Sequence, residues 1–229
     1  MIRFTGVSHS YGDRAVLADI DLELSEPRIG VIGANGSGKS TLARMINGLV
    51  VPEHGCVGVN GLDTARQGRE VRRQVGFIFA DPDTQIVMPT VAEDVAFSLR
   101  RHRLPRADVA ARVAAALARF GLAEHAEHPA HLLSSGQKQL LALAAVLVTE
   151  PQILVCDEPT TLLDLRNAER VHRLIAGLDQ QVVLVTHQLA LVADWDRVLV
   201  VDGGRIVADG PGRLTVPAYI ELMSQGIDT

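Results

Sequence analysis

The stretch GANGSGKST occupies residues 33–41 and decides the fold. It follows the pattern G-x-x-x-x-G-K-S, in which Lys39 and Ser40 close the loop. A short apolar run of strand type precedes it at residues 28–32, and residues 41–49 follow with apolar side chains at helical spacing. A glycine-rich loop between a strand and a helix is the context in which this pattern binds phosphate. We therefore interpret it as a phosphate-binding loop rather than a turn that matches by chance.

The chemistry of this loop follows from its residue types. Its glycines let the backbone curl so that successive N–H groups point at a polyphosphate. The helix that begins there adds the positive end of its dipole. Lys39 would place a point charge against the β- and γ-phosphates, and Ser40 would offer its hydroxyl to Mg²⁺. The residues of the loop that we expect to contact a nucleotide are Gly33, Asn35, Gly36, Ser37, Gly38, Lys39, Ser40 and Thr41.

Length and composition limit the class of protein. The 229 residues can bury a substantial core and suit one large domain or a core with an inserted lobe. The net charge of −5 gives no indication of a nucleic-acid partner. The longest apolar run, residues 140–148, is shorter than the roughly 20 residues of a membrane span. Cys56 and Cys156 are too few for a disulfide framework, so we expect a soluble cytosolic protein with reduced thiols, and docking on a membrane partner stays open.

The order of predicted elements indicates an α/β fold. Strand patterns alternate with helix patterns, which is typical of a mainly parallel sheet. Residues 1–27 alternate in strand fashion and predict an antiparallel portion, and residues 197–207 predict a hairpin around Asp-Gly-Gly. Between residues 81 and 150 the pattern is helical. We therefore expect a discontinuous nucleotide-binding core, 1–80 and 151–229, with an inserted helical subdomain at 81–150. The predicted helices of this insert are 91–99, 106–120 and 135–149.

A second motif, ILVCDE at residues 153–158, supplies two carboxylates at the end of an apolar strand. Asp157 would hold Mg²⁺, since this hard cation prefers oxygen ligands. Glu158 would polarise a water against the γ-phosphate, a form of general-base help worth roughly 10²–10⁴ in rate. Acidic pairs at strand ends are common, so the weight of this motif comes from its combination with the phosphate-binding loop.

A third motif, LSSGQKQ at residues 133–139, opens a long apolar helix ahead of the carboxylate pair. By itself Ser134 is a suitable helix cap. However, the order of phosphate-binding loop, serine–glycine–glutamine motif, Asp-Glu strand and VTH at 185–187 resembles the ATP-binding cassette (ABC) ATPases over essentially the whole chain. The resemblance implies a P-loop NTPase (RecA-like) fold and the binding and hydrolysis of ATP with Mg²⁺.

In that family two subunits dock head to tail and hold ATP between the phosphate-binding loop of one and the signature motif of the other. The resemblance therefore implies a homodimer or a pairing with a second ABC ATPase. Tyr11, which without the resemblance would be a tyrosine capping a β-meander, would stack on adenine, and His187 matches the family's switch histidine. Asp164 lies in the loop that communicates across the dimer. The signature residues expected to contact the γ-phosphate on the opposite subunit are Ser134, Gly136 and Gln137.

Two positions depart from the family pattern. Ser135 stands where the signature usually has a second glycine, and its small side chain is expected to be tolerated. Ala80 stands where the family usually has a glutamine that is associated with Mg²⁺, water and the link to the membrane subunit. Alanine provides none of these contacts, so this part of the family's mechanism does not carry over to Ala80.

The sequence DPDTQIV at residues 81–87 supplies a glutamine just beyond Ala80, and we expect this residue, Gln85, to belong to the nucleotide-binding site. Together with PTVAEDVAF at 89–97 this stretch resembles the ATPases of energy-coupling factor (ECF) transporters, and TTLLDLRN at 160–167 is most similar to the biotin-transporter ATPases. Without the resemblance, Gln85 is an ordinary exposed helix residue. The resemblance implies a peripheral subunit on the cytoplasmic face of the membrane. Its partners would be a transmembrane coupling (T) subunit and a substrate-binding (S) subunit, and its role vitamin uptake.

Two other functions stay open at this stage. One is a soluble ABC ATPase of cofactor assembly or repair, although the chain contains neither the coiled-coil insertion nor the second cassette that would favour it. The other is a nucleotide-dependent docking subunit with weak turnover because of Ala80. We interpret the residues 100–103 (RRHR) as a solvated helix end. We do not expect His125, His128 and His131 to bind a metal, since Pro129 interrupts any helix that would align them.

Overall fold

The computed structural model describes residues 1–225 and contains two sheets. The larger sheet has six strands in the order β10-β9-β3-β8-β7-β6. All neighbouring pairs from β9 to β6 are parallel, and β10 pairs antiparallel with β9 in the predicted hairpin. The strands are β3 (Arg28–Ile32), β6 (Val75–Ile78), β7 (Ile153–Asp157), β8 (Gln181–Val185), β9 (Arg197–Asp202) and β10 (Arg205–Gly210). The mainly parallel core predicted from the sequence is confirmed.

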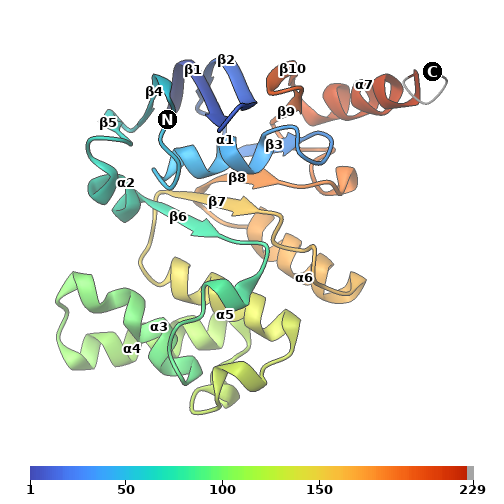
Figure 1. Ribbon diagram of the computed structural model, residues 1–229. Helices are drawn as coiled ribbons and strands as arrows, with labels where there is room; N and C mark the ends of the chain where they lie inside the picture. The colour runs from blue at the N-terminus through green and yellow to red at the C-terminus, as the bar shows by residue number, and fades with distance from the viewer. Residues whose placement is uncertain (226–229) are drawn as a thin grey trace.

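The smaller sheet is the predicted antiparallel portion. It has four strands in the order β2-β1-β4-β5 and lies over α1 (Lys39–Ile46), which separates it from the larger sheet (Figure 1). Its strands are β1 (Ile2–Tyr11), β2 (Arg14–Leu24), β4 (His54–Val59) and β5 (Leu62–Asp63). Apolar residues alternate along β1 and β2 because one face of this sheet packs on the core while the other is more exposed.

Side chains of the parallel strands feed two separate hydrophobic clusters, one on each face. In β7, Ile153 and Val155 belong to the cluster that contains α1 and the smaller sheet, whereas Leu154 and Cys156 belong to the cluster under the helices. Successive side chains of a strand point to opposite faces, so both faces of this sheet demand apolar residues. The continuous apolar runs in the sequence reflect this double burial.

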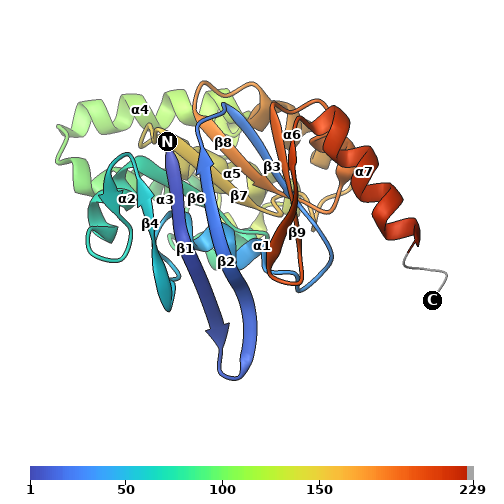
Figure 2. The same cartoon turned by 90° about the horizontal axis from the view of Figure 1, so that it is seen from above.

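The remaining helices cover the larger sheet and extend beyond it. Helices α3, α4 and α5 pack on one another beside β6, and α7 lies at the opposite end of the molecule from α4 (Figures 1 and 2). The α-helices are α2 (Gly68–Gln74), α3 (Val91–Leu99), α4 (Arg106–Phe120), α5 (Ser135–Leu147), α6 (Leu165–Ala176) and α7 (Gly212–Gln225). Short 3₁₀ turns are η1 (Pro82–Thr84), η2 (Arg100–His102), η3 (Ala123–His125), η4 (Ala130–Leu132) and η5 (Leu189–Leu191).

The helical stretch matches the sequence closely, because α3 and α4 have the predicted ends and α5 ends only slightly earlier than predicted. The division of the chain at residues 81 and 150 into subdomains stays a prediction. Helix α7 is the last element of the described residues. Within residues 1–225, no helix combines the length and the hydropathy required to cross a membrane.

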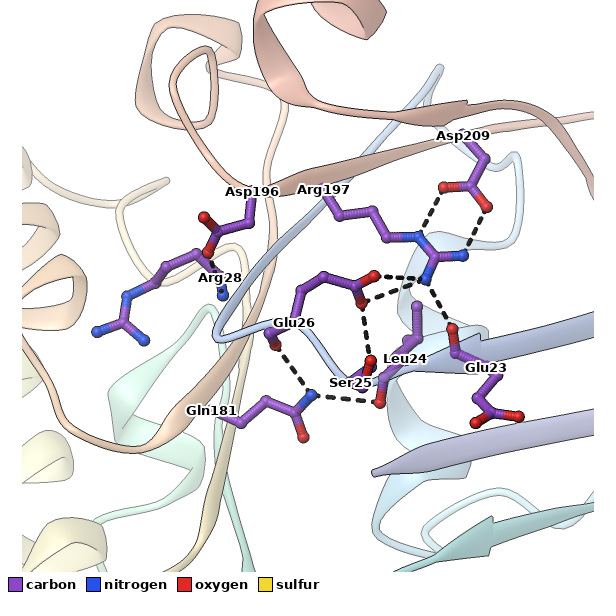
Figure 3. A network of polar contacts seen from close by, with 9 residues as sticks. All are labelled: Glu23, Leu24, Ser25, Glu26, Arg28, Gln181, Asp196, Arg197 and Asp209. Carbon is purple, nitrogen blue, oxygen red and sulfur yellow. Dashed lines mark hydrogen bonds and ion pairs between the residues drawn. The ribbon is translucent and has the colours of Figure 1, made fainter.

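A polar network at the start of β3 ties the two sheets together (Figure 3). Arg197 donates to both carboxylate oxygens of Asp209 at 2.7 Å, to Glu26 Oε1 at 3.0 Å and to the carbonyl of Glu23 at 2.7 Å. Gln181 Nε2 donates to the Glu26 carbonyl at 3.0 Å. Burial alone would raise the pKa of Glu26, but backbone hydrogen bonds and Arg197 outweigh it and lower that pKa. The network therefore fixes the chain entering β3, whose other end leads into the phosphate-binding loop.

Candidate nucleotide-binding site

The parallel pairing of the central strands brings their carboxyl ends to one edge of the sheet. Val185 of β8 is level with Val31 of β3 and with Asp157 of β7. The phosphate-binding loop follows β3, Glu158 follows β7 and His187 follows β8. We call residues 33–41 together with Asp157, Glu158 and His187 the P-loop end.

Two positions of the loop require glycine in this conformation. Gly33 has φ +146°, and a Cβ there would lie 2.1 Å from the carbonyl oxygen of Val201. Gly38 has φ +110°, and its Cβ would lie 2.7 Å from the carbonyl oxygen of Val16. Residues with side chains rarely adopt such φ values. The two carbonyl oxygens belong to the backbone, so they cannot move aside as the end of a flexible side chain could. The loop is therefore held tightly between β9 and β2 before α1 begins at Lys39.

Lys39 lies inside the mouth of this loop. Its Nζ donates to the carbonyls of Gly33 at 2.9 Å and Ala34 at 2.8 Å, and the residue is buried. Burial lowers the pKa of Lys39, while the nearby carboxylates of Glu158 and Asp157 act in the opposite direction. Two backbone oxygens hold the ammonium group at the mouth of the loop. A phosphate that enters the loop can therefore replace these oxygens as the partner of Nζ, and the charged group does not have to cross apolar surroundings.

Ser40 and Asp157 form the oxygen pair that suits a divalent cation. Ser40 Oγ donates to Asp157 Oδ1 at 2.7 Å, and Arg44 pairs with Asp157 Oδ2 at 3.2 Å. In the described part of the chain, no cluster of three or more His, Cys, Asp or Glu side chains is arranged to hold a metal. Mg²⁺ needs only one or two protein oxygens when substrate phosphates and water complete its shell. The donor set fits Mg²⁺ that arrives with a nucleotide.

Glu158 is held in a strained and fixed position. Its φ is +54°, a left-handed conformation that is uncommon for residues with side chains and recurs at functional sites. Its Oε2 accepts from His187 Nδ1 at 2.5 Å and from Thr161 Oγ1 at 2.7 Å. Both of these hydrogen bonds go to one carboxylate oxygen, so Oε1 is the oxygen left to contact a water. Sequence reasoning missed Thr161, which only the tight turn after β7 brings back to Glu158.

Tyr11 lies at the open side of the P-loop end. It is 53% exposed and, with Arg14 and Val16, lines a hollow of about 200 Å³ whose floor is the phosphate-binding loop. The loop residues that line the hollow are Gly36, Gly38, Lys39, Ser40 and Thr41. An exposed ring beside a phosphate site suits stacking on a nucleobase. Arg14 was not predicted, although the hairpin register Tyr11↔Arg14 brings it opposite Tyr11.

The signature residues do not line this hollow. Ser134 caps α5 in a capping box: its Oγ accepts from Gln137 N at 3.3 Å, and its own N–H donates to Gln137 Oε1 at 2.9 Å. Ser134 is exposed, whereas Gly136 is buried so closely that a Cβ would lie 2.7 Å from Asn167 Cγ. The serine hydroxyl accepts in the cap, so its own hydrogen stays available to an oxyanion outside the chain.

Asp164 lies next to the signature motif across Asn167. Its Oδ1 accepts from Asn167 N at 2.8 Å, and its Oδ2 accepts from Asn167 Nδ2 at 2.9 Å. These hydrogen bonds, first of all the one from the backbone, lower the pKa of Asp164. The signature motif and the Asp164 loop therefore form one unit. We call residues 133–139 together with Asp164 and Asn167 the signature end.

Two histidines, His125 and His128, contact each other beside the signature end. Gln137 Nε2 lies 3.0 Å from His125 Nε2, and His125 Nδ1 lies 2.8 Å from His128 Nδ1. His125 ends the 3₁₀ turn η3, and the turn that follows brings His128 back to it, with His128 N donating to the His125 carbonyl at 2.9 Å. Their spacing of three residues is visible in the sequence, but the turn that joins them is not.

Gln85 has its side chain on the free edge of β6. Its Oε1 accepts from Phe79 N at 3.3 Å, and its Nε2 donates to the Phe77 carbonyl at 3.1 Å. A contact between Gln85 and a nucleotide would require these two hydrogen bonds to open, so that contact stays a prediction. Ala80 follows Phe79 and is half-buried.

A groove lies beside β6, between the sheet and the helices. It has a volume of about 730 Å³ and lies between α2 and β6 on one side and α3 and α5 on the other. A second hollow of about 400 Å³ continues along α3 and shares Phe97 and Arg100 with it. Basic residues of the groove are Arg72, Arg73, Arg100, Arg101 and His102. The residues of η2 are exposed, as expected for a solvated helix end.

Known proteins resemble this chain over almost its full length. A family model described as ABC transporter matches residues 17–161. The biotin transport ATP-binding protein BioM of Rhizobium etli is 48% identical over 96% of this chain and 98% of its own length. The energy-coupling factor transporter ATP-binding protein EcfA1 of Caldanaerobacter subterraneus is 38% identical over 100% of this chain and 87% of its own length.

A solved structure agrees with the fold. The structure of cbiO1 from Clostridium perfringens, described as part of the ABC transporter complex cbiONQ, has a TM-score of 0.84. It is 31% identical in sequence and covers 98% of this chain and 93% of its own. The α/β fold class expected from the sequence is confirmed.

Proposed function

The chain belongs to the ABC transporter ATP-binding family and is an ATPase, and from this premise we propose that it powers an ECF-type importer. The similarity to BioM and EcfA1 supports the importer, and one observation supports its mechanism: a P-loop end and a signature end occur on the same chain, but the signature residues do not line the chain's own nucleotide hollow. Each end thus offers half of a site that a second ABC subunit completes.

Nucleotide binding uses the P-loop end. The backbone N–H groups of residues 33–41 and the start of α1 bind the phosphates, and Lys39 pairs with the β- and γ-phosphates. Tyr11 stacks on adenine. Ser40 and Asp157 would hold Mg²⁺, which when bound neutralises charge on the phosphate oxygens.

Hydrolysis depends on Glu158. Its Oε1 accepts a hydrogen bond from the attacking water and orients it toward the γ-phosphate. An ionised carboxylate only accepts, so His187 Nδ1 must carry the proton of their 2.5 Å hydrogen bond. His187 and Thr161 thereby prevent the carboxylate from rotating away, and positioning of this kind is a main source of rate in phosphoryl transfer.

The second half of each site comes from another ABC subunit, either an identical chain or a different cassette. Ser134, Gly136 and Gln137 of that subunit contact the γ-phosphate with the helix α5 dipole behind them. Two bound ATP molecules favour the closed pair, and hydrolysis removes the phosphate that bridges its halves. Asp164, adjacent to the signature motif, senses the partner's site.

The basic groove beside β6 is the docking site for a transmembrane coupling subunit, which in turn carries a substrate-binding subunit. A helix with apolar residues and carboxylates would match Phe97 and the arginines of the groove. Gln85 is hydrogen-bonded to Phe77 and Phe79, and Phe77 also lines the groove. The chain accordingly works as a peripheral subunit on the cytoplasmic face of the membrane.

Docking is tested by capture from solubilised membranes with the tagged chain. Replacing Arg100 and Arg101 by Glu is expected to abolish co-purification of membrane protein, since like charges then face the partner. Arg205→Glu, an exposed change on β10, is the matched control and is expected to leave capture intact. Equal capture by all variants would contradict the groove, and no membrane protein with the wild type would contradict the transporter function.

The imported substrate that we favour is biotin, because the relative BioM is a biotin transport protein by name and is similar along the full chain. Uptake of labelled biotin by cells that express the complex is expected to require ATP and to stop with Glu158→Gln. Biotin uptake that is equal in the absence of this chain would exclude biotin and leave another vitamin or a metal ion as the cargo.

Ala80 motivates a second candidate, a nucleotide-dependent docking subunit with weak turnover. The retained Glu158–His187 pair favours the full enzyme instead. For the enzyme, Ala80→Gln is expected to change the turnover of the membrane complex by less than about tenfold, or 1.4 kcal/mol of barrier. A nearly silent wild type that gains more than this from glutamine would favour the docking subunit.

A further inference from the structure

His9 lies directly against the ring of Tyr11, and it does not line the nucleotide hollow. The two ring centroids are 4.8 Å apart and the ring planes meet at 87°, which is an edge-to-face contact. His9 and Tyr11 are two residues apart on β1 and so project to the same face of the strand. We propose that His9 is a positioning residue that holds the Tyr11 ring ready to stack on the nucleobase.

The imidazole of His9 makes no hydrogen bond that would explain its place. Both Nδ1 and Nε2 are buried and lack a partner in the described part of the chain. A buried polar atom without a partner destabilises the fold. The ring therefore acts through its aromatic surface, and the contact with Tyr11 is the aromatic contact that it makes.

Tyr11 needs such support because little else packs around it. The residue is 53% exposed at the last position of β1, next to the turn at Gly12, whose φ is +59°. An exposed ring that is free to rotate loses side-chain entropy when a ligand orders it. His9 orders the ring before the nucleotide arrives, so the base binds to a surface that is already in place.

His9 is also anchored to the frame of the site. It is level with Leu17 on β2, and Leu17 is buried against the phosphate-binding loop, where a Cβ on Gly38 would lie 2.9 Å from Leu17 Cδ2. Through these neighbours, from His9 to Leu17 to Gly38, the fold sets the distance between the Tyr11 ring and the phosphate-binding loop. This inference rests on the proposed stacking role of Tyr11.

The test separates the base from the phosphates. Dissociation constants of the full chain are measured with Mg²⁺ for ATP and for inorganic tripolyphosphate, which has no base, and their ratio reports the contribution of the base. An edge-to-face aromatic pair corresponds to about two- to tenfold in such a constant. His9→Ala is expected to weaken ATP binding by this factor and to leave tripolyphosphate binding unchanged. His9→Phe keeps the ring contact and is expected to keep the wild-type ratio.

Tyr11→Ala and the double variant complete the test. If His9 acts through Tyr11, His9→Ala in the Tyr11→Ala background has no further effect on the ratio. The inference is overturned if His9→Ala keeps the wild-type ratio, weakens both ligands equally, or acts independently of Tyr11, or if His9→Phe behaves like His9→Ala. An unchanged ratio in Tyr11→Ala would instead remove the stacking role itself, and the inference with it.

Discussion

The side chains of the P-loop end and those of the signature end differ in how deeply they are buried and in what holds them. At the P-loop end, Lys39 and Asp157 are buried and hydrogen-bonded, and Glu158 is held in a strained conformation by two partners. At the signature end, Ser134 and Asp164 are exposed and accept hydrogen bonds from residues of the helices that they cap. One end is thus organised around chemistry, whereas the other presents hydrogen-bond donors outward.

This difference shows which part of the fold stabilises each half of the site. Buried charges and strained backbone persist only where the surrounding structure holds them in place, and the central strands of the sheet do so at the P-loop end. Donors that serve another molecule need only a fixed backbone, and a capped helix start provides that at the surface. The chain therefore contains both halves of a composite site, and each half is expected to respond differently to substitution.

Glu158→Gln is expected to have the largest effect. Loss of the carboxylate that orients water lowers steady-state phosphate release by about 10²- to 10⁴-fold, while ATP binding stays close to that of the wild type because the phosphate contacts are elsewhere. Turnover within a few-fold of the wild type would mean that chemistry does not depend on the strained residue of the P-loop end.

Arg197→Leu tests the support beneath the P-loop end. It leaves Glu26 and Asp209 without their shared partner, so the free energy of unfolding is expected to fall by about 1–3 kcal/mol in denaturant titrations. The control is Arg3→Leu, which breaks the exposed Arg3–Glu23 pair and is expected to cost less than about 1 kcal/mol. Equal losses in the two variants would contradict a special role for the network.

Gly136→Ala tests how tightly the signature end is fixed. The new Cβ displaces the Asn167 side chain and with it the hydrogen bond to Asp164, a loss of about 0.5–1.5 kcal/mol. Gly58→Ala is the matched control, since its Cβ meets nothing closer than 3.8 Å and its φ is ordinary. Melting temperatures of the two variants measure the difference, and a destabilisation confined to Gly58→Ala would contradict the packing at Gly136.

The smallest expected effect is a pH dependence of stability from Glu26. Its pKa in the folded chain is lowered, so this contribution is complete above the ordinary glutamate value of about 4.3 and is lost as the pH falls through the folded pKa. Denaturant titrations of the wild type and Arg197→Leu between neutral and acidic pH measure it. A wild type that loses no more stability than the variant on acidification would contradict the role of the Arg197 pairing.

The sequence predicted the elements that depend on local patterns. Apolar runs and the pattern of residues 33–41 gave the strands, the loop and α1, and alanine-rich periodicity gave α3 and α4 with their ends. Parallel pairing then made it predictable that Asp157 and the loop meet at one edge. These predictions are correct because hydrophobic periodicity and the backbone conformation of a glycine-rich loop are determined by short stretches of sequence.

Side-chain contacts made within irregular turns were beyond such reasoning. Thr161 reaches Glu158 because the chain turns directly after β7, and Gln85 bonds to Phe77 of β6 rather than extending from a helix. The His125–His128 contact likewise depends on the turn that follows η3. The residues in each contact are close in the sequence, but residue spacing alone does not give the conformation of a turn.

The most direct test of a site shared between two ends is a mixture of two inactive chains. Lys39→Ala removes the ammonium group that binds the phosphates at the P-loop end, and Ser134→Arg blocks the signature end with a bulky charged side chain. Each variant alone is expected to have almost no ATPase activity. A mixed pair keeps one complete site, so an equal mixture is expected to recover about a quarter of the wild-type rate by simple counting of sites. A mixture that stays inactive although the two chains assemble with each other, or a Ser134→Arg chain that is fully active alone, would contradict the composite site.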